Sequence, residues 1–222
     1  MPSTVTIDAI EFTRFVQSSF KIKGGGLIFY IDPHKLTEKE VGGEKADIIL
    51  ITHPHFDHLD PAAIEACSKA DTVIVANAPC VREIANRPNI VSLREGESTI
   101  QKGVSILTVP GYNDYHKRSE GFNVGFAFNL DGKQILHSGD TGKIPELSSL
   151  GSLDIAMVPI GGTYTMDEDE AADAVINMLK PRHAIPMHYG YATGGDPKRF
   201  QSLVGGAAKV HIVDPLLKIK VG

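Results

Sequence analysis

The sequence predicts an α/β fold in which two β-sheets pack as a sandwich with helices outside. The chain has 222 residues, 42% hydrophobic and 22% charged, so it is large enough to bury the core of one globular domain. Its first part is rich in hairpin signals, which indicate antiparallel sheet, whereas its later part alternates strand-like and helical segments, which indicate parallel or mixed sheet. No repeat, low-complexity segment or linker divides the chain, and residues 1–222 are expected to form a single domain.

Short β-rich runs, several of them bounded by Gly, Asp or Pro, predict the strands. They cover residues 4–12, 19–22, 26–32, 46–52, 72–77, 89–93, 103–110, 122–130, 134–139, 154–160, 183–188 and 209–214. The glycines at 24–26 and the pair Asp131-Gly132 each lie between two such runs, which predicts hairpin turns.

Three helices are predicted where capping residues precede a helical pattern. An aspartate followed by a proline opens the helices expected at residues 62–70 and 198–204, because aspartate caps a helix and proline suits its first turn. Thr165 with Glu168 forms a capping-box pattern before a helix at residues 169–180, which a proline then ends.

Charge and composition argue against several classes of function. A net charge of −5 offers no basic face for nucleic acid or an anionic membrane, and neither is expected as a partner. No apolar run approaches the ~20 residues of a membrane span. The N-terminal segment has neither a basic leader nor an apolar signal core, so a cytoplasmic location is expected. Cys67 and Cys80 are too few for a disulfide framework and are expected to be small buried hydrophobes.

The densest chemical signal is the stretch IILITHPHFDHLD at residues 48–60, where His53, His55, Asp57 and His58 follow a buried strand. Such groups are costly to bury without partners. A loop fixed at a strand end can turn several of them toward one point. Imidazole and carboxylate are ligands that suit zinc, iron or manganese. Four ligands so close would strain one tetrahedral site, so two ions side by side are expected.

Three other segments carry a polar side chain where an apolar run stops, which is the usual place for a site in an α/β sheet. They are Asp140 in HSGDTG, His188 in PMHYG and His116 in the loop NDYHKRSEG. For His116 a solvated loop histidine is the alternative, because no tight motif surrounds it.

With these residues the chain resembles the metallo-β-lactamase superfamily, whose His-x-His-x-Asp-His signature stands here at residues 53–58. The strings HSGDTG, PIGGTYTM and PMHYG make the resemblance closest to the small stand-alone metal-dependent hydrolases, which include the ascorbate-6-phosphate lactonase-like proteins. It implies an α/β fold that is a four-layer αββα sandwich of two mixed β-sheets with helices on the outer faces. It also implies two divalent metal ions, most often zinc, although manganese and iron use the same ligand types.

The resemblance further implies a ligand set, residue by residue. The first ion would be held by His53, His55 and His116, the second by Asp57, His58 and His188, and Asp140 would bridge the two.

Several further residues have two interpretations each. Asp32 could accept the outward N–H of a ligand histidine or simply end its strand. Tyr164 could point its phenol at a developing oxyanion or be a packed loop aromatic. The cations next to proposed ligands could bind an anionic substrate or, like most exposed cations, nothing; they are Lys117, Arg118 and Lys143.

The remaining histidines are expected to have no ligand role. His34 is expected in a surface turn and His137 as a hydrogen-bonded residue of the core or around the ligands. His183 and His211 lie within predicted strands and are expected to be structural.

The expected function is hydrolysis of a small ester, lactone or phosphoester by water that two metal ions activate, with Asp57 also orienting the nucleophile and moving a proton. One alternative is a di-iron redox protein of the same fold, whose relatives tend to replace a signature histidine with glutamate; here the full histidine set remains. The other is a non-catalytic metal-binding protein, which would be recognised by a lost ligand, and none is missing. The loops at 112–121, 161–166 and 189–195 are expected to frame the pocket, and self-association into a homo-oligomer is a further expectation.

Overall fold

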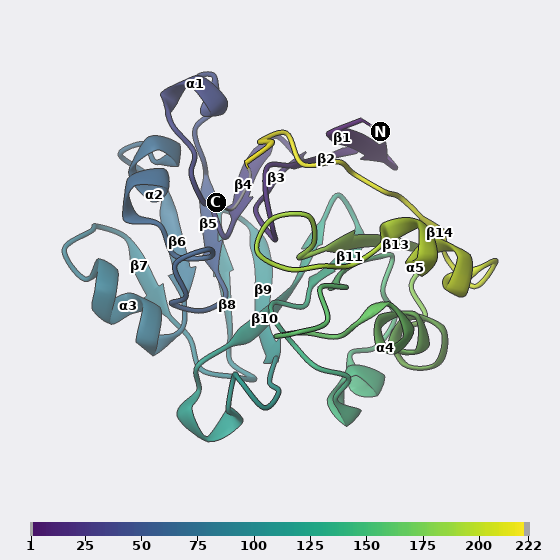
Figure 1. Cartoon of the computed structure of the whole chain (residues 1–222). Coiled ribbons are helices and arrows are strands. Elements are labelled where there is room, and N and C mark those ends of the chain that lie inside the picture. The colour runs from purple at the N-terminus through teal and green to yellow at the C-terminus, as the bar shows by residue number, and fades with distance from the viewer. Residues whose placement is uncertain (1, 220–222) are drawn as a thin grey trace.

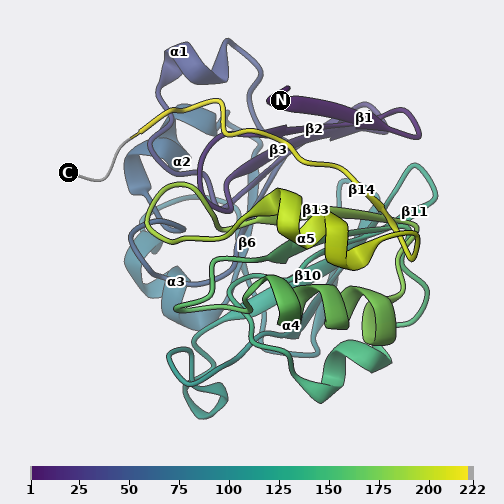
Figure 2. The ribbon, with the colours of Figure 1, turned by 45° about the vertical axis from the view of Figure 1, so that its right-hand side comes forward.

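The computed structural model of the chain describes residues 2–219, and within them two seven-stranded mixed β-sheets pack face to face. Helices cover the outer face of each sheet, on opposite sides of the molecule (Figures 1 and 2). The predicted α/β sandwich of four layers, αββα, is therefore confirmed.

The first sheet is formed by the N-terminal part of the chain, with its strands in sequence order. Its members are β1 (Thr4–Ile7), β2 (Ile10–Arg14), β3 (Phe20–Gly24), β4 (Leu27–Ile31), β5 (Ile48–Ile51), β6 (Val73–Ala76) and β7 (Ile90–Ser92). Strands β1 to β4 pair antiparallel through hairpins, and β4 to β7 pair parallel.

The second sheet repeats this plan, although the sequence has no detectable repeat. Its members are β8 (Ser98–Gln101), β9 (Val104–Pro110), β10 (Val124–Leu130), β11 (Lys133–His137), β12 (Ile155–Pro159), β13 (His183–Met187) and β14 (Lys209–Val210). Strands β8 to β11 are antiparallel, and β11 to β14 are parallel.

The helices join the parallel strands and lie outside the sheets, as crossover connections require. Those on the first sheet are α1 (Glu38–Val41), α2 (Pro61–Cys67) and α3 (Ala78–Ile84). Those on the second are α4 (Glu168–Asp173), which continues as the π-helical segment η3 (Ala174–Leu179), and α5 (Pro197–Val204). Two short 3₁₀ segments are η1 (Arg118–Glu120) and η2 (Pro145–Ser149). Across residues 2–219, every helix is too short or too polar to cross a membrane.

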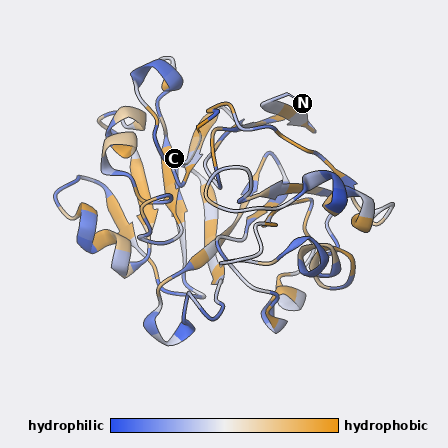
Figure 3. Ribbon diagram, viewed as in Figure 1, coloured by the Kyte–Doolittle hydropathy of each residue, from blue (hydrophilic) through white to orange (hydrophobic). Residues whose placement is uncertain are grey.

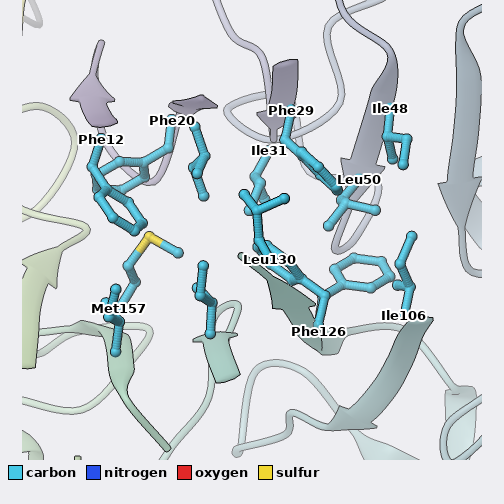
Figure 4. Packing of buried hydrophobic residues seen from close by; sticks show 14 of the residues in the cluster. Phe12, Phe20, Phe29, Ile31, Ile48, Leu50, Ile106, Phe126, Leu130 and Met157 are labelled. Carbon is cyan, nitrogen blue, oxygen red and sulfur yellow. The ribbon is translucent and has the colours of Figure 1, made fainter. Parts of the chain in front are cut away.

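The main core lies between the two sheets, where side chains from both inner faces interdigitate (Figure 4). Phe29 of the first sheet stacks on Phe128 of the second, with ring centroids 5.2 Å apart. Alternation along β5 explains its four consecutive aliphatic residues, because its odd and even positions enter different cores. Ile48 and Leu50 enter the core between the sheets, whereas the other two pack under the helices. Strands β5 and β6 are accordingly apolar, whereas the outer helices α1 and α3 carry polar surface (Figure 3).

The strand prediction was wrong in three places, one of them the strand expected at 209–214, which ends at Val210. The segment at 4–12 is a hairpin of two strands, because Asp8 and Ala9 both adopt left-handed backbone angles, with φ of 47° and 70°. Strand β8 was missed, because it lies at a sheet edge and its one aliphatic residue, Ile100, is 72% exposed. The hairpin turn at Asp131-Gly132 is confirmed, with both residues at positive φ.

The helix prediction needs a similar correction. Asp60 caps α2 as expected, and Asp196 does the same for α5. The capping box of α4, however, is formed by Asp167 and Glu170 rather than by Thr165 and Glu168. The chain cannot enter the helix at residue 165, because Met166 still bonds through its backbone to Thr141 and Gly162. The short helices α1 and α3 were not predicted.

Asn77 joins the two halves of the molecule where the site is built. Its amide Oδ1 caps α3 by accepting from the Cys80 N–H at 3.1 Å, and its Nδ2 donates to the carbonyls of Phe122 and Thr52 at 2.7 and 3.2 Å. We expect Asn77→Ala to lower the free energy of unfolding by about 2–3 kcal/mol, because it removes a cap and leaves the Phe122 carbonyl without its donor, whereas the Thr52 carbonyl still accepts from Val124. Denaturant unfolding monitored by circular dichroism measures this. Asn77→Ser retains a capping hydroxyl and should lose less; equal losses would contradict the assigned roles.

Candidate metal centre

The polar residues of the centre follow three strands directly. His53 follows β5 of the first sheet, whereas Asp140 and His188 follow β11 and β13 of the second. Strands β11, β12 and β13 run parallel, so their carboxyl ends meet at one edge. A hydrogen bond from the Val124 N–H to the Thr52 carbonyl, 3.1 Å long, ties the end of β5 to that edge. The fold therefore brings the predicted residues of both sheets together.

His53, His55 and His116 form the first group of donor atoms. His55 Nδ1 lies 3.1 Å from His53 Nε2 and 3.2 Å from His116 Nε2. His116 is only 1% exposed, so the alternative of a solvated loop histidine is wrong.

Asp57, His58 and His188 form the second group, and Asp140 lies between the two groups. Asp140 Oδ2 is 2.9 Å from His188 Nε2, 3.3 Å from His58 Nε2 and 3.8 Å from His53 Nε2. One buried carboxylate thus contacts histidines of both groups.

The outward nitrogens of three of these histidines donate to fixed acceptors. His58 Nδ1 donates to Asp32 Oδ2 at 2.7 Å, and the same carboxylate accepts from Thr52. His116 Nδ1 donates to Asn113 Oδ1 at 3.0 Å. The Thr193 hydroxyl donates to the His188 carbonyl, so it can accept from His188 Nδ1, which lies 3.2 Å away. Each of these rings therefore keeps a proton on Nδ1 and turns Nε2 inward. Nε2 is then the atom available to a metal ion.

The electrostatics of the centre follow from burial and from Asp140. Burial lowers the pKa of His116 to about 4 and that of His53 well below its usual value, so both are neutral at pH 7. Burial alone would raise the pKa of Asp140, but the imidazoles of His188 and His58 outweigh it and hold that pKa well below normal. Burial likewise opposes protonation of His58, yet its neighbouring carboxylates, Asp140 foremost, hold its pKa well above normal.

The residues present fit divalent cations. Two inward atoms, His58 Nε2 and Asp140 Oδ1, are buried and have no hydrogen-bond partner among residues 2–219. Buried polar atoms are nearly always paired, so two unpaired atoms in one cluster indicate a missing partner. The carboxylate oxygen of Asp140 calls for a positive or donating partner, and a donor set of imidazole and carboxylate without thiolate suits zinc, manganese or iron.

A pocket of about 270 Å³ opens onto the centre. It is lined by Gln17, His55, Phe56, Asp57, Asp140, Tyr164, His188, Ala192 and Thr193. Two of the three loops expected to frame the pocket, 161–166 and 189–195, contribute to this lining. The third, 112–121, supports it through Asn113, whose amide donates to the carbonyls of Asp140 and Tyr164.

The structure also places the residues that had two interpretations. Asp32 accepts the outward N–H of His58, as the first interpretation proposed. Tyr164 is 46% exposed at the pocket. Arg118 pairs with Glu95 and Glu146, and Lys143 pairs with Asp173 at 2.9 Å.

Of the histidines without an expected ligand role, His137 and His183 lie as predicted, whereas His211 follows β14 instead of lying within a strand. His137 is buried and donates to the Ser18 carbonyl at 3.1 Å, whereas His183 and His211 contact each other at 3.0 Å. The prediction for His34 was wrong: it is 3% exposed and lies beside the rings of Phe56 and Tyr191, which cover it.

Sequence reasoning missed the residues that hold the ligands in place. Asn113 stands three positions before His116, and Thr52 directly precedes His53, so their closeness along the chain was a usable signal. Thr193 lies in a loop that was only expected to frame the pocket. Gln17 gave no signal, because it lies 40 residues before Asp57 in a segment without a motif.

The profile of the β-lactamase superfamily domain matches residues 11–188, which include every proposed ligand. The chain belongs to this superfamily. A UPF0173 metal-dependent hydrolase of Thermococcus onnurineus is 37% identical over 91% of this chain and 96% of its own length. One from Pelotomaculum thermopropionicum is 36% identical over 93% and 97%, respectively.

Solved structures agree with the superfamily assignment. Igni18, a metallo hydrolase from Ignicoccus hospitalis, superposes with a TM-score of 0.80 and 27% identity, covering 93% of this chain and 95% of that one. A crystal structure from Parabacteroides distasonis reaches a TM-score of 0.81 at 28% identity, covering 97% and 99%. The predicted membership of the metallo-β-lactamase superfamily is confirmed, and the narrower likeness to ascorbate-6-phosphate lactonase-like proteins stays a prediction.

Metal binding to this superfamily member should release protons. The raised pKa of His58 means that the metal-free chain holds a proton on Nε2 at pH 7, since Nδ1–H is already donated to Asp32. An ion can bind Nε2 only after that proton leaves, so we expect release of about one proton per chain and an affinity that rises with pH. Calorimetric titration with Zn²⁺ in two buffers of different ionisation enthalpy measures the release. His58→Gln should abolish it, and a heat independent of the buffer would contradict the protonation assigned to His58.

Proposed function

We propose that the chain is a hydrolase that uses two divalent metal ions, with zinc as the expected metal, to cleave a small ester, lactone or phosphoester. The observation that carries the proposal is the position of Asp140, whose Oδ2 lies within 3.8 Å of ring nitrogens from both histidine groups. The names of the relatives from Thermococcus and Pelotomaculum, and that of Igni18, support hydrolysis with metal.

The ligands follow the two groups of donor atoms. His53, His55 and His116 would hold one ion, Asp57, His58 and His188 the other, and Asp140 both. A bound pair of divalent ions supplies a water of lowered pKa and a Lewis acid that polarises the oxygen gaining charge.

Two side chains at the pocket would assist the reaction directly. Asp57 is 7% exposed and lines the pocket, so its carboxylate can orient a water and accept its proton. The Tyr164 hydroxyl has no hydrogen bond to any residue of the described chain and is exposed at the same pocket, so it can donate to a developing oxyanion.

The function is tested by offering the metal-loaded protein four bond types: a lactone, a thioester, a phosphodiester and a β-lactam. We expect turnover of a lactone or phosphodiester, and a loss of roughly 10²–10⁴-fold in Asp57→Asn, because that change removes the proton acceptor. Metal content of both samples is measured in parallel. Turnover equal in the wild type and Asp57→Asn would contradict the assigned site, and a protein that binds iron and turns over none of the four would favour the redox alternative.

The ligand assignment has a separate prediction. Asp140→Ala and His188→Ala should stay folded and bind the first ion, but lose most of the second ion and most of the activity. The second ion would lose the proposed bridging carboxylate in the first variant and a ring nitrogen in the other. Elemental analysis after dialysis gives the stoichiometry, and circular dichroism confirms the fold. Full turnover in either variant would exclude these residues as ligands.

A further inference from the structure

Gln17 has an unexplained position beside the second group. It follows β2 and is fully buried. Its amide Nε2 lies 3.3 Å from Asp57 Oδ2 and 3.0 Å from His188 Nε2, the atoms that would hold an ion. Its Oε1 is also buried, and no group in residues 2–219 hydrogen-bonds it. The amide is thus bonded only through its nitrogen, and to the two atoms that would hold the ion.

The backbone of Gln17 is held firmly against the turn that carries His188. The Gln17 carbonyl accepts from Arg14 Nε at 3.0 Å and from the His188 N–H at 3.2 Å. Arg14 also donates to the Tyr189 carbonyl at 2.6 Å and stacks its guanidinium 3.9 Å from the centre of the Tyr189 ring. Gln17 and His188 both have left-handed backbones, with φ of 49° and 57°, which is uncommon outside glycine and concentrates at functional sites.

The amide orientation cannot be the same with metal bound. His188 carries its proton on Nδ1, so Nε2 has one lone pair, and an ion at Nε2 uses it. The N–H groups of Gln17 would then face a cation. A half-turn of the amide about its Cγ–Cδ bond exchanges the oxygen and nitrogen positions without moving other heavy atoms. The half-turn would place Oε1 where Nε2 now lies, and the amide nitrogen at the buried position that Oε1 now occupies without a hydrogen bond.

We infer that the Gln17 amide oxygen is an additional ligand of the ion held by Asp57, His58 and His188. Donor atoms that share one ion lie roughly 3–3.5 Å apart, since metal–ligand bonds are about 2.0–2.2 Å long, and the amide position meets this for Asp57 and His188. The inference rests on the proposed dinuclear function. This ligand would increase the difference between the two ion sites. The first site has three imidazoles, whereas the second would have more oxygen ligands, which favours a harder ion such as Mn²⁺ there.

The test compares Gln17→Leu with the wild type by equilibrium dialysis and by the visible spectrum after Co²⁺ loading. We expect the affinity for the second ion to fall about 10–100-fold while the first ion is unaffected. The Co²⁺ absorption should strengthen, because losing a ligand moves a five- or six-coordinate ion toward tetrahedral geometry. Gln17→Glu, which keeps an oxygen at this position, should retain the second ion. In competition, the wild type should take Mn²⁺ at the second site more readily than Gln17→Leu does.

Ser19→Ala is the matched control, because the Ser19 hydroxyl is buried in the same segment without a hydrogen bond and is not part of the pocket. If Gln17→Leu fails to fold, Gln17→Met gives the same measurement with a more flexible apolar chain. Wild-type affinity and an unchanged Co²⁺ spectrum in the apolar variant would overturn the role of Gln17 alone. A wild type that binds fewer than two ions would overturn the dinuclear function as well.

Discussion

The buried carboxylate of Asp140 is the group on which the rest of the centre depends. It is 2% exposed, and an ionised carboxylate in such surroundings is very costly unless positive or donating groups compensate it. The compensation comes from both sheets, with His58 following β5 and His188 following β13. Sliding one sheet against the other would leave this charge unpaired. The electrostatics of the site and the packing of the sandwich therefore constrain each other.

Glycine makes this close approach sterically feasible. Gly139 precedes Asp140 with φ of 62°, and a Cβ there would lie 2.8 Å from the Val124 carbonyl oxygen. At Gly161 a Cβ would lie 2.4 Å from the His188 carbonyl oxygen. Real Cβ atoms do not approach backbone oxygens so closely, so a side chain at either position would push the carboxylate or the imidazole away from the centre. Gly139 of HSGDTG and Gly161 of PIGGTYTM thus allow the close approach because they have no side chain.

Much of the fold followed from the sequence because its signals are local. Period-2 alternation, hairpin glycines and aspartate-proline caps act within a few residues, and most strands and the helices at Asp60 and Asp196 lie where these signals place them. The failures concern contacts between distant segments. β8 is a strand because it pairs with β9 at the edge of the second sheet. His34 is buried because Phe56 and Tyr191 cover it, and the backbone of Thr141 holds the segment before α4 out of the helix. No local pattern encodes such tertiary constraints.

The charges around the pocket bear on the kind of substrate it can hold. Of the three cations considered as anchors for an anion, Arg118 and Lys143 are paired with carboxylates, and Lys117 is exposed and does not line the pocket. The described pocket lining contains no lysine or arginine, and it includes Phe56, which is 69% exposed, with Tyr164 and Ala192. An anionic group in this pocket would therefore depend on the metal ions for its positive partner. An apolar group, in contrast, gains from contact with Phe56, Tyr164 and Ala192 whether or not metal is bound. Among the lining residues, polar recognition therefore comes from the proposed ligands with Gln17 and Thr193, and apolar contact comes from Phe56, Tyr164 and Ala192.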